Sequence, residues 1–519
     1  MELIKKNIHM DHMKCKAVTQ VTLEEDVNIS DNKPDVSKIV FEKGDIKIDE
    51  VKASQDHAFM RGKLLFSILY TSSDSEKTVW SMEGSIPFEE QINMEGLRPG
   101  DSVNVNWSME DLSIGLINSR KISVRSLITF TLASHELYDM ELPVDLSCDD
   151  SIEYRRKKIN LWEIAVWKKD VFRIKEEMEI PKNLPNIFHI IWENVRPLWM
   201  EFKVLDGKIG VQGELSVFFL YEGEGDESPI RFYEAVLPFA GVVECSGCLE
   251  NMIPVIHYQK SQQEMEIRPD FDGEQRIASV EFVFDLDIRL YEEENTEMIS
   301  DVYGVTKEIE TVENEEDLKS ILVKNVGKQK VTGRIKIKSE NGRIMQLVHS
   351  EADVVIDNTT IVDEGIEING SITVRILYVT NDDAIPFSTV KEELPFTYTI
   401  EAPGIKEGCT YTIDPNVEQI NVSMVDSEEI DVKALLSYHT VVFCNNTSAV
   451  IKDVTVSELN LDLLSKLPSI VIYIVKAGDS LWQIGKRYYV PVARIKELNG
   501  LTSDLIYPGD KLLIVKDFY

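Results

Sequence analysis

The chain contains three copies of one sequence pattern, and this repeat constrains its fold more than any other feature. The clearest segment of each copy begins at Gly62 (GKLLFSILYTSSD), Gly213 (GELSVFFLYEGEG) and Gly370 (GSITVRILYVTND). Gly213 follows Gly62 by 151 residues, and Gly370 follows Gly213 by 157. The same two spacings separate further landmarks: Tyr70, Tyr221 and Tyr378; Pro87-Phe88, Pro238-Phe239 and Pro395-Phe396; and the segments that begin at Pro34, Pro185 and Gly342. This register across three copies indicates three homologous domains.

Each copy has the pattern of β-strands. In the first copy Leu64, Phe66 and Ile68 alternate with other residues, and the period of two fits a strand with one core face. Such strands need a second layer over their apolar face, so we expect one β-sandwich per repeat. The repeated glycine predicts a close backbone approach or a bulge. The repeated Pro-Phe pair predicts the start of a strand that is anchored in the core.

Other segments suggest the limits of the domains. We expect repeats at 1–150, 151–305 and 325–467, followed by a small domain at 468–519. Residues 306–324 are acidic and lack alternation, which suggests a linker. The segments 123–140 and 314–325 have patterns that also fit short helices.

Composition narrows the classes of partner. The net charge is −35, from 55 basic and 90 acidic residues, so we expect no nucleic acid partner. The residues from Ile470 onward differ, with seven Lys or Arg against five Asp or Glu. No apolar run approaches the ~20 residues that span a bilayer, and the N-terminus lacks the apolar region of a signal peptide. We therefore expect a protein that is not integral to the membrane and is made in the cytoplasm.

The last fifty residues predict the order strand, helix, helix, strand. Tyr473 to Val475 fits a strand, and Ser480 with Gln483 forms a capping box for the first helix. Pro491 suits the start of a second helix, which Asn499-Gly500 ends. The return strand is Leu512 to Val515. These elements and the sequence YIVKAGDSLWQIGKRY…DLIYPGDKLLIV resemble the LysM family.

The LysM resemblance implies a binding groove between two loops. One loop holds Gly478, Asp479 and Ser480, and the other ends at Ile506 and Tyr507. In glycan-binding members such loops contact N-acetyl groups and sugar hydroxyls. Lys486 and Lys496 are candidate basic contacts for a protein partner. An alternative interpretation is that these residues only fold the domain.

The three repeats resemble the SPOCS domain of bacterial sporulation proteins, through DNKPDVSKIV, the G…ILY strand and the following Pro-Phe. Three such repeats before one LysM domain resemble the clostridial spore-coat morphogenetic proteins, counterparts of stage VI sporulation protein D. The resemblance implies a non-enzymatic scaffold at the forespore surface and in the spore coat. Its LysM domain would dock on stage IV sporulation protein A, the ATPase of the coat's basement layer, and its repeats would bind other coat proteins.

The sequence offers only weak candidates for a catalytic site or a metal site. The sequence has no GxxxxGK[ST], GxSxG or HExxH motif, so we nominate no catalytic residue and no cofactor. His9, His12 and Cys15 have a spacing that could hold a metal on a helix, but we expect none. Cys245 and Cys248 form a CxxC without a second pair, and we expect all six cysteines to be reduced.

Two alternative functions remain open. The chain could bind peptidoglycan of the spore cortex or cell wall through its LysM domain. It could also be a wall hydrolase with LysM targeting, although no motif supports a hydrolase. The sequence leaves open the oligomeric state, the role of each repeat and the order of assembly.

Overall fold

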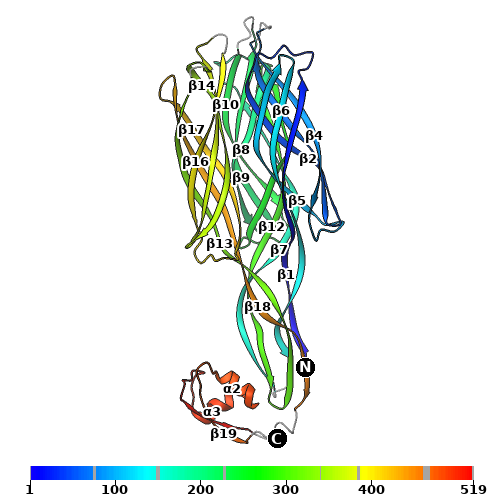
Figure 1. Cartoon of the computed structure of the whole chain (residues 1–519), viewed down its shortest axis with the longest axis vertical. Helices are drawn as coiled ribbons and strands as arrows, with labels where there is room; N and C mark the ends of the chain where they lie inside the picture. Colours follow the sequence, from blue (N-terminus) through cyan, green and yellow to red (C-terminus); the bar gives the residue numbers. More distant parts are fainter. Residues whose placement is uncertain are drawn as a thin grey trace.

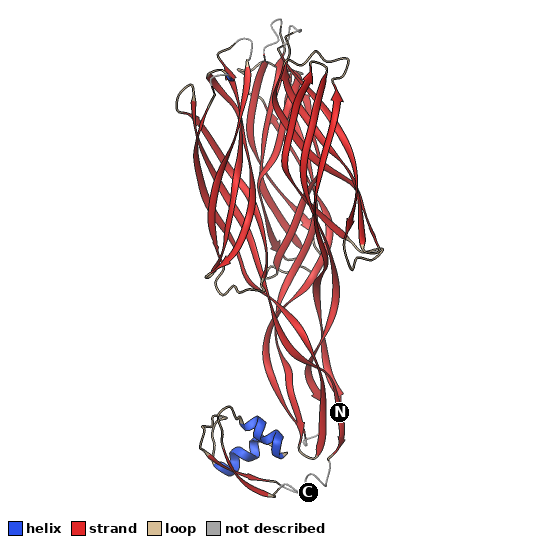
Figure 2. Cartoon of the chain, in the orientation of Figure 1, coloured by secondary structure: helices blue, strands red, loops and turns tan. Residues whose placement is uncertain are grey.

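The computed structural model describes residues 2–73, 78–147, 152–225, 230–338, 341–382, 386–459 and 468–516. The body of the molecule consists of β-strands, and the helices α2 and α3 lie in a small C-terminal domain (Figure 2). The prediction of a mainly β chain with repeated sandwiches is confirmed.

Each repeat folds into two three-stranded antiparallel sheets that enclose an apolar core. The first repeat consists of β1 (Glu2–Asn28), β6 (Lys121–Ser147) and β5 (Val103–Asn118) in one sheet, and β2 (Lys38–Ser54), β3 (His57–Thr71) and β4 (Val79–Asn93) in the other. The second consists of β7 (Ile152–Glu179), β12 (Gln275–Gly304) and β11 (Ile253–Pro269), with β8 (Ile187–Leu205), β9 (Lys208–Gly223) and β10 (Ile230–Glu244). The third consists of β13 (Lys307–Lys336), β18 (Glu429–Glu458) and β17 (Thr410–Met424), with β14 (Ile344–Val362), β15 (Gly365–Thr380) and β16 (Phe387–Glu401).

The repeated glycine and the repeated phenylalanine form one structural unit. Gly62 lies directly opposite Phe88, and the other two repeats have the same pairs, Gly213 with Phe239 and Gly370 with Phe396. A Cβ atom on these glycines would lie 2.8, 2.6 and 2.9 Å from the ring of the opposite phenylalanine. A backbone oxygen of the other neighbouring strand lies even closer to the same Cβ positions, at 2.5, 2.3 and 2.2 Å. This confirms the close backbone approach that the sequence predicts, and no larger residue fits there.

The repeated tyrosine ties the central strand to the loop before the sheet. Tyr70 and Tyr221 are fully buried, and their hydroxyls each donate a 3.2 Å hydrogen bond to a backbone oxygen, that of Pro34 and that of Pro185. Tyr378 does the same at 3.3 Å with the oxygen of Asn341. Burial raises the pKa of Tyr70 to about 12. In each repeat this hydrogen bond satisfies the buried tyrosine hydroxyl and fixes the loop before the sheet.

The three sandwiches pack side by side and share a central cluster (Figure 1). Its apolar part includes Leu69, Leu220 and Leu377, which have the same position in the three repeats. Beside them lies a polar layer of equivalent residues. The Lys43 ammonium donates to the Asn194 amide oxygen at 3.0 Å, and the Asn194 amide donates to the Glu351 carboxylate at 2.6 Å. The repeats therefore form one body.

A narrow stalk extends from one end of this body (Figure 1). In the first repeat, residues 2–13 of β1 pair with residues 135–147 of β6, beyond the region where β5 pairs with β6. The second and third repeats contribute the corresponding ribbons, from β7 with β12 and from β13 with β18. Ile8, Leu161 and Leu318 belong to the apolar cluster that holds the three ribbons together.

Three interpretations of the sequence are wrong here. The Pro-Phe pair does not begin a strand, because it lies in the middle of β4, β10 and β16. The proposed linker at 306–324 is strand, because Lys307–Lys336 forms β13 and its first half is one arm of the stalk. The segments 123–140 and 314–325 are also strands rather than helices. A two-stranded ribbon of the stalk buries only a narrow stripe of side chains, so the acidic exposed positions hide the alternation in the sequence.

Candidate functional site

The C-terminal domain places its candidate residues on two loops beside a small sheet. It consists of β19 (Ile470–Ile474), α2 (Leu481–Tyr488), α3 (Val492–Asn499) and β20 (Lys511–Val515), which confirms the predicted order. Leu481, Ile484 and Ile495 are buried in its core between the helices and the sheet. Val475, which follows β19, bonds to Gly509 and Asp510 of the turn before β20. This pairing brings the two loops to the same end of the domain.

The first loop is held by its own polar side chains. Gly478 has a φ of +89°, a conformation that favours glycine. The Asp479 carboxylate accepts a 2.7 Å hydrogen bond from the Tyr473 hydroxyl and a 2.8 Å bond from the Lys476 amide. These two bonds hold the pKa of Asp479 below its usual value. Ser480 caps α2 in a capping box with Gln483, as predicted.

The second loop presents apolar side chains to solvent. Ile506 packs against the core of the domain. The side chains of Leu505 and Tyr507 are each 62% exposed. The backbone of Tyr507 holds the turn, because its amide donates to the Asp510 carboxylate at 2.8 Å. Among the candidate residues, Tyr507 therefore has the most side-chain surface that folding does not use.

The two candidate lysines already have acidic partners within the chain. The Lys496 ammonium contacts Asp504 at 2.8 Å, inside the C-terminal domain. The Lys486 ammonium contacts Asp301 at 2.6 Å, and Asp301 belongs to β12 in the stalk. Lys486 therefore faces the stalk and does not join the two loops.

The stalk contact is a feature that the sequence did not reveal. The Trp482 indole donates to Asp301 at 2.7 Å, and its ring lies edge-on to Tyr303 with centroids 4.9 Å apart. The Tyr303 hydroxyl donates to the backbone oxygen of Val490 at 3.0 Å. Burial acts to raise the pKa of Asp301, but the hydrogen bonds from Lys486 and Trp482 outweigh it and lower that pKa. Helix α2 thus docks on the end of the stalk.

Comparison with protein-family models identifies all four domains. The SipL SPOCS domain matches residues 35–117, 186–267 and 343–425, and the LysM domain matches 473–515. The chain is a SPOCS-repeat protein with a C-terminal LysM domain. Each SPOCS match runs from the second to the fifth strand of its sandwich, so the long stalk strands lie mostly outside it. A LysM domain supports binding to peptidoglycan, and SPOCS domains suggest a role in sporulation.

Curated relatives match only the LysM region. N-acetylmuramoyl-L-alanine amidase sle1 of Staphylococcus saprophyticus is 50% identical over 42 residues, which are 8% of this chain and 13% of that protein. A probable N-acetylmuramidase of Lactococcus lactis is 52% identical over 42 residues, 8% of this chain and 10% of that protein. The uncharacterized protein YkzQ of Bacillus subtilis is 46% identical over 43 residues, which are 8% of this chain and 57% of that protein. The matched segments thus span less than two thirds of each relative. No solved structure matches the chain.

The two families found are binding domains rather than catalytic domains. In the described residues no group of three or more His, Cys, Asp or Glu is placed to hold a metal. His9 and His12 contact Asp139 and Glu136 along the β1–β6 ribbon. Among the helices that the structure describes, none is long and apolar enough to cross a membrane.

The CxxC of the second SPOCS domain is a structural turn. Cys245 and Cys248 are buried, and the Cys248 amide donates to the Cys245 oxygen at 3.2 Å. Met94 with Leu97 and Ala402 with Ile405 make the same turn in the other two repeats. The cysteines therefore occupy apolar positions that the repeat fills with any small or aliphatic side chain.

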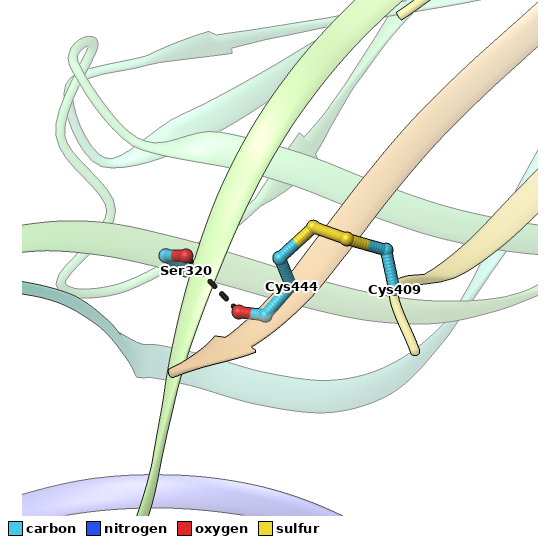
Figure 3. Close-up of a disulfide and its surroundings, with 3 residues drawn as sticks. All are labelled: Ser320, Cys409 and Cys444. Carbon is cyan, nitrogen blue, oxygen red and sulfur yellow. Dashed lines mark hydrogen bonds between the residues drawn. A yellow bond between two sulfur atoms is a disulfide. The ribbon is translucent and has the colours of Figure 1, made fainter. Parts of the chain in front are cut away.

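The expectation that all cysteines are reduced is wrong for one pair. Cys409 and Cys444 form a disulfide between the start of β17 and strand β18 (Figure 3). The next cross-strand pair, Thr410 with Phe443, explains why residues 35 positions apart meet. Only this register brings them together, so their spacing in the sequence gave no signal. Cys148 lies outside the described residues.

Proposed function

We propose that the chain is a non-enzymatic morphogenetic scaffold of the spore coat. Its LysM domain docks on a coat ATPase like stage IV sporulation protein A, and the chain promotes encasement of the forespore by the coat. It acts in the mother-cell cytoplasm, at the forespore surface. Two observations support this proposal: the three SPOCS domains suggest a role in sporulation, and the LysM domain belongs to a family of binding domains.

The observation that carries the proposal is the position of the LysM domain. A stalk built by all three SPOCS repeats holds that domain at one end of an elongated body (Figure 1). Helix α2 contacts the stalk, whereas Tyr507 on the second loop stays exposed. A docking domain at the tip lets the repeats reach other coat proteins while the loops engage the basement layer. We expect those contacts to use exposed strand edges of the repeats.

The test uses the full chain as bait for the purified coat ATPase, with soluble murein fragments as competitor. We expect capture of the ATPase, no displacement by murein, and at least a tenfold loss of affinity in Tyr507→Ala, which is about 1.4 kcal/mol. Phe271→Ala is the matched control, because that aromatic side chain is fully exposed in the second repeat, outside the LysM domain. Equal binding by the wild type and Tyr507→Ala would place the contact outside the second loop.

The alternative is that the LysM domain binds peptidoglycan of the cortex or cell wall. The LysM region is 50% identical to a segment of N-acetylmuramoyl-L-alanine amidase sle1, and this similarity favours the alternative. Under this alternative the full chain sediments with murein and captures no ATPase. The same Tyr507→Ala variant then loses murein binding, so one set of proteins separates the two functions.

A further inference from the structure

Strand β19 of the LysM domain is an exposed edge with three outward isoleucines. Ile470, Ile472 and Ile474 are 64%, 69% and 56% exposed. Their sheet has two strands, β19 and β20, and in the described residues no third strand lies along β19. The far edge of β20 is instead covered, because the Asn499 side chain bonds to both the amide and the oxygen of Leu513. Open edges rich in β-branched residues readily accept another strand.

The hydrogen-bond pattern shows which backbone groups are available. The amide of Val475 donates to Asp510, and the amide of Lys516 donates to the oxygen of Ser469. In an antiparallel ladder the bonding residues alternate, so the odd-numbered residues of β19 face β20. The amides and oxygens of Ile470, Ile472 and Ile474 therefore point away from β20, towards the open edge.

The sequence of β19, Ile-Val-Ile-Tyr-Ile, reads almost the same in both directions. In an antiparallel pair centred on Ile472, residue 472 lies opposite itself, and Ile470 lies opposite Ile474. All three pairs consist of residues whose backbone groups point outward, and all six isoleucines share one face. We propose that β19 pairs with β19 of a second copy of this chain and makes a continuous four-stranded sheet.

Charge and shape favour a second copy that meets tail to tail. The segment from Ile470 onward has a small basic excess, while the whole chain has a net charge of −35. Two such bodies repel each other, so contact is easiest where the charge is lowest. The LysM domain lies beside the narrow end of the stalk, and β19 lies on the side of that domain away from α2 (Figure 1). The paired domains would keep the two acidic bodies at opposite ends of the dimer.

The interface is small, so the dimer depends on concentration. One strand pair buries far less than the ~800 Å² per partner of a standard stable interface. Many copies held at one surface would raise the effective concentration and favour pairing there. In solution we expect a reversible monomer–dimer equilibrium.

The first test is disulfide crosslinking of the full chain, in a background where Cys15 and Cys148 are replaced by Ser. Residue 472 faces itself across the dimer axis, and opposite residues in such a ladder lie within reach of a disulfide. We expect Ile472→Cys to crosslink at least tenfold faster than Ile470→Cys, whose equivalents lie about four residues apart along the ladder. Equal rates for these two variants, or none for either, would overturn the proposed pairing.

The second test is sedimentation of the full chain as a function of concentration. Ile472→Pro removes an outward amide without touching the bonds to β20, so the LysM domain keeps its fold. We expect this variant to weaken dimerisation at least tenfold, whereas Leu505→Lys, at a similarly exposed residue off the edge, does not. A wild type that stays monomeric at every concentration, or a dimer that Ile472→Pro leaves intact, overturns the proposal. A strand of another protein on this edge would also give a monomeric wild type.

Discussion

Asn194 donates a 2.6 Å hydrogen bond to Glu351, the residue with the same position in the next repeat. The third equivalent residue, Lys43, donates to the other end of the same amide. One position of the repeat has therefore become a cation, an amide and an anion. Three identical residues would place like groups together in the buried centre, so these differences specify which repeat lies beside which.

Removing the charge of Glu351 should loosen the centre of the body. Burial acts to raise the pKa of this carboxyl, but Arg375 and Arg196 outweigh it and lower that pKa to about 2. Glu351→Gln leaves the Arg375 guanidinium with only the exposed Asp353 as its anion, so we expect a loss of about 1.5–3 kcal/mol in the free energy of unfolding. Chemical denaturation measures this, with the exposed Glu392→Gln as control. Equal midpoints for both variants would contradict the expectation.

The half-buried His135 should make stability depend on pH. Burial and the nearby Arg289 lower the pKa of this imidazole to about 4, whereas an unfolded histidine titrates near ~6.5. Between these pH values, His135 is protonated in the unfolded chain but neutral in the folded chain. Its contribution to stability therefore falls as pH drops from ~6.5 to 4.

His135→Asn should flatten that part of the pH profile. Thermal unfolding at several pH values measures the slope, and His9→Asn is the control because His9 is an exposed histidine in the same ribbon. A slope that His135→Asn leaves unchanged would assign the pH dependence to other groups.

Two glycines of β9 should respond in opposite ways to the same substitution. A Cβ on Gly213 would lie 2.6 Å from the Phe239 ring, whereas on Gly210 its nearest neighbours are 3.7 Å away. We expect Gly213→Ala to cost about 1–3 kcal/mol through overcrowding. Gly210→Ala should be neutral or stabilise by up to ~1 kcal/mol, because alanine restricts the unfolded chain. Denaturation midpoints of the two variants test the difference, and equal midpoints would refute it.

Loss of Asp301 should release the LysM domain from the stalk. Asp301→Ala removes the acceptor of Trp482 and the partner of Lys486. Hydrogen bonds to a charged group contribute about 1.5–3 kcal/mol, so we expect amide exchange to rise roughly tenfold or more around Tyr303 and Val490. Lys496→Ala, which breaks an ion pair within the LysM domain, should leave that exchange unchanged. Unchanged exchange in Asp301→Ala would mean that other contacts hold the domain.

Local patterns in the sequence were enough to predict the sandwiches and the LysM elements. The glycine opposite its phenylalanine, the capping box at Ser480 and the alternation before Tyr70 each depend on neighbours within one strand pair or one helix turn. Such contacts join residues that are close in sequence or that recur in each repeat, so one sequence shows them as a pattern.

Only the tertiary structure decided how the units are joined. The acidic segment at 306–324 becomes a stalk strand because two other ribbons cover its single apolar stripe. Lys486 faces Asp301 because helix α2 docks on β12. Cys409 meets Cys444 through the register of β17 and β18. Each of these contacts links residues far apart in sequence, and such pairs leave no periodic trace that one sequence can show.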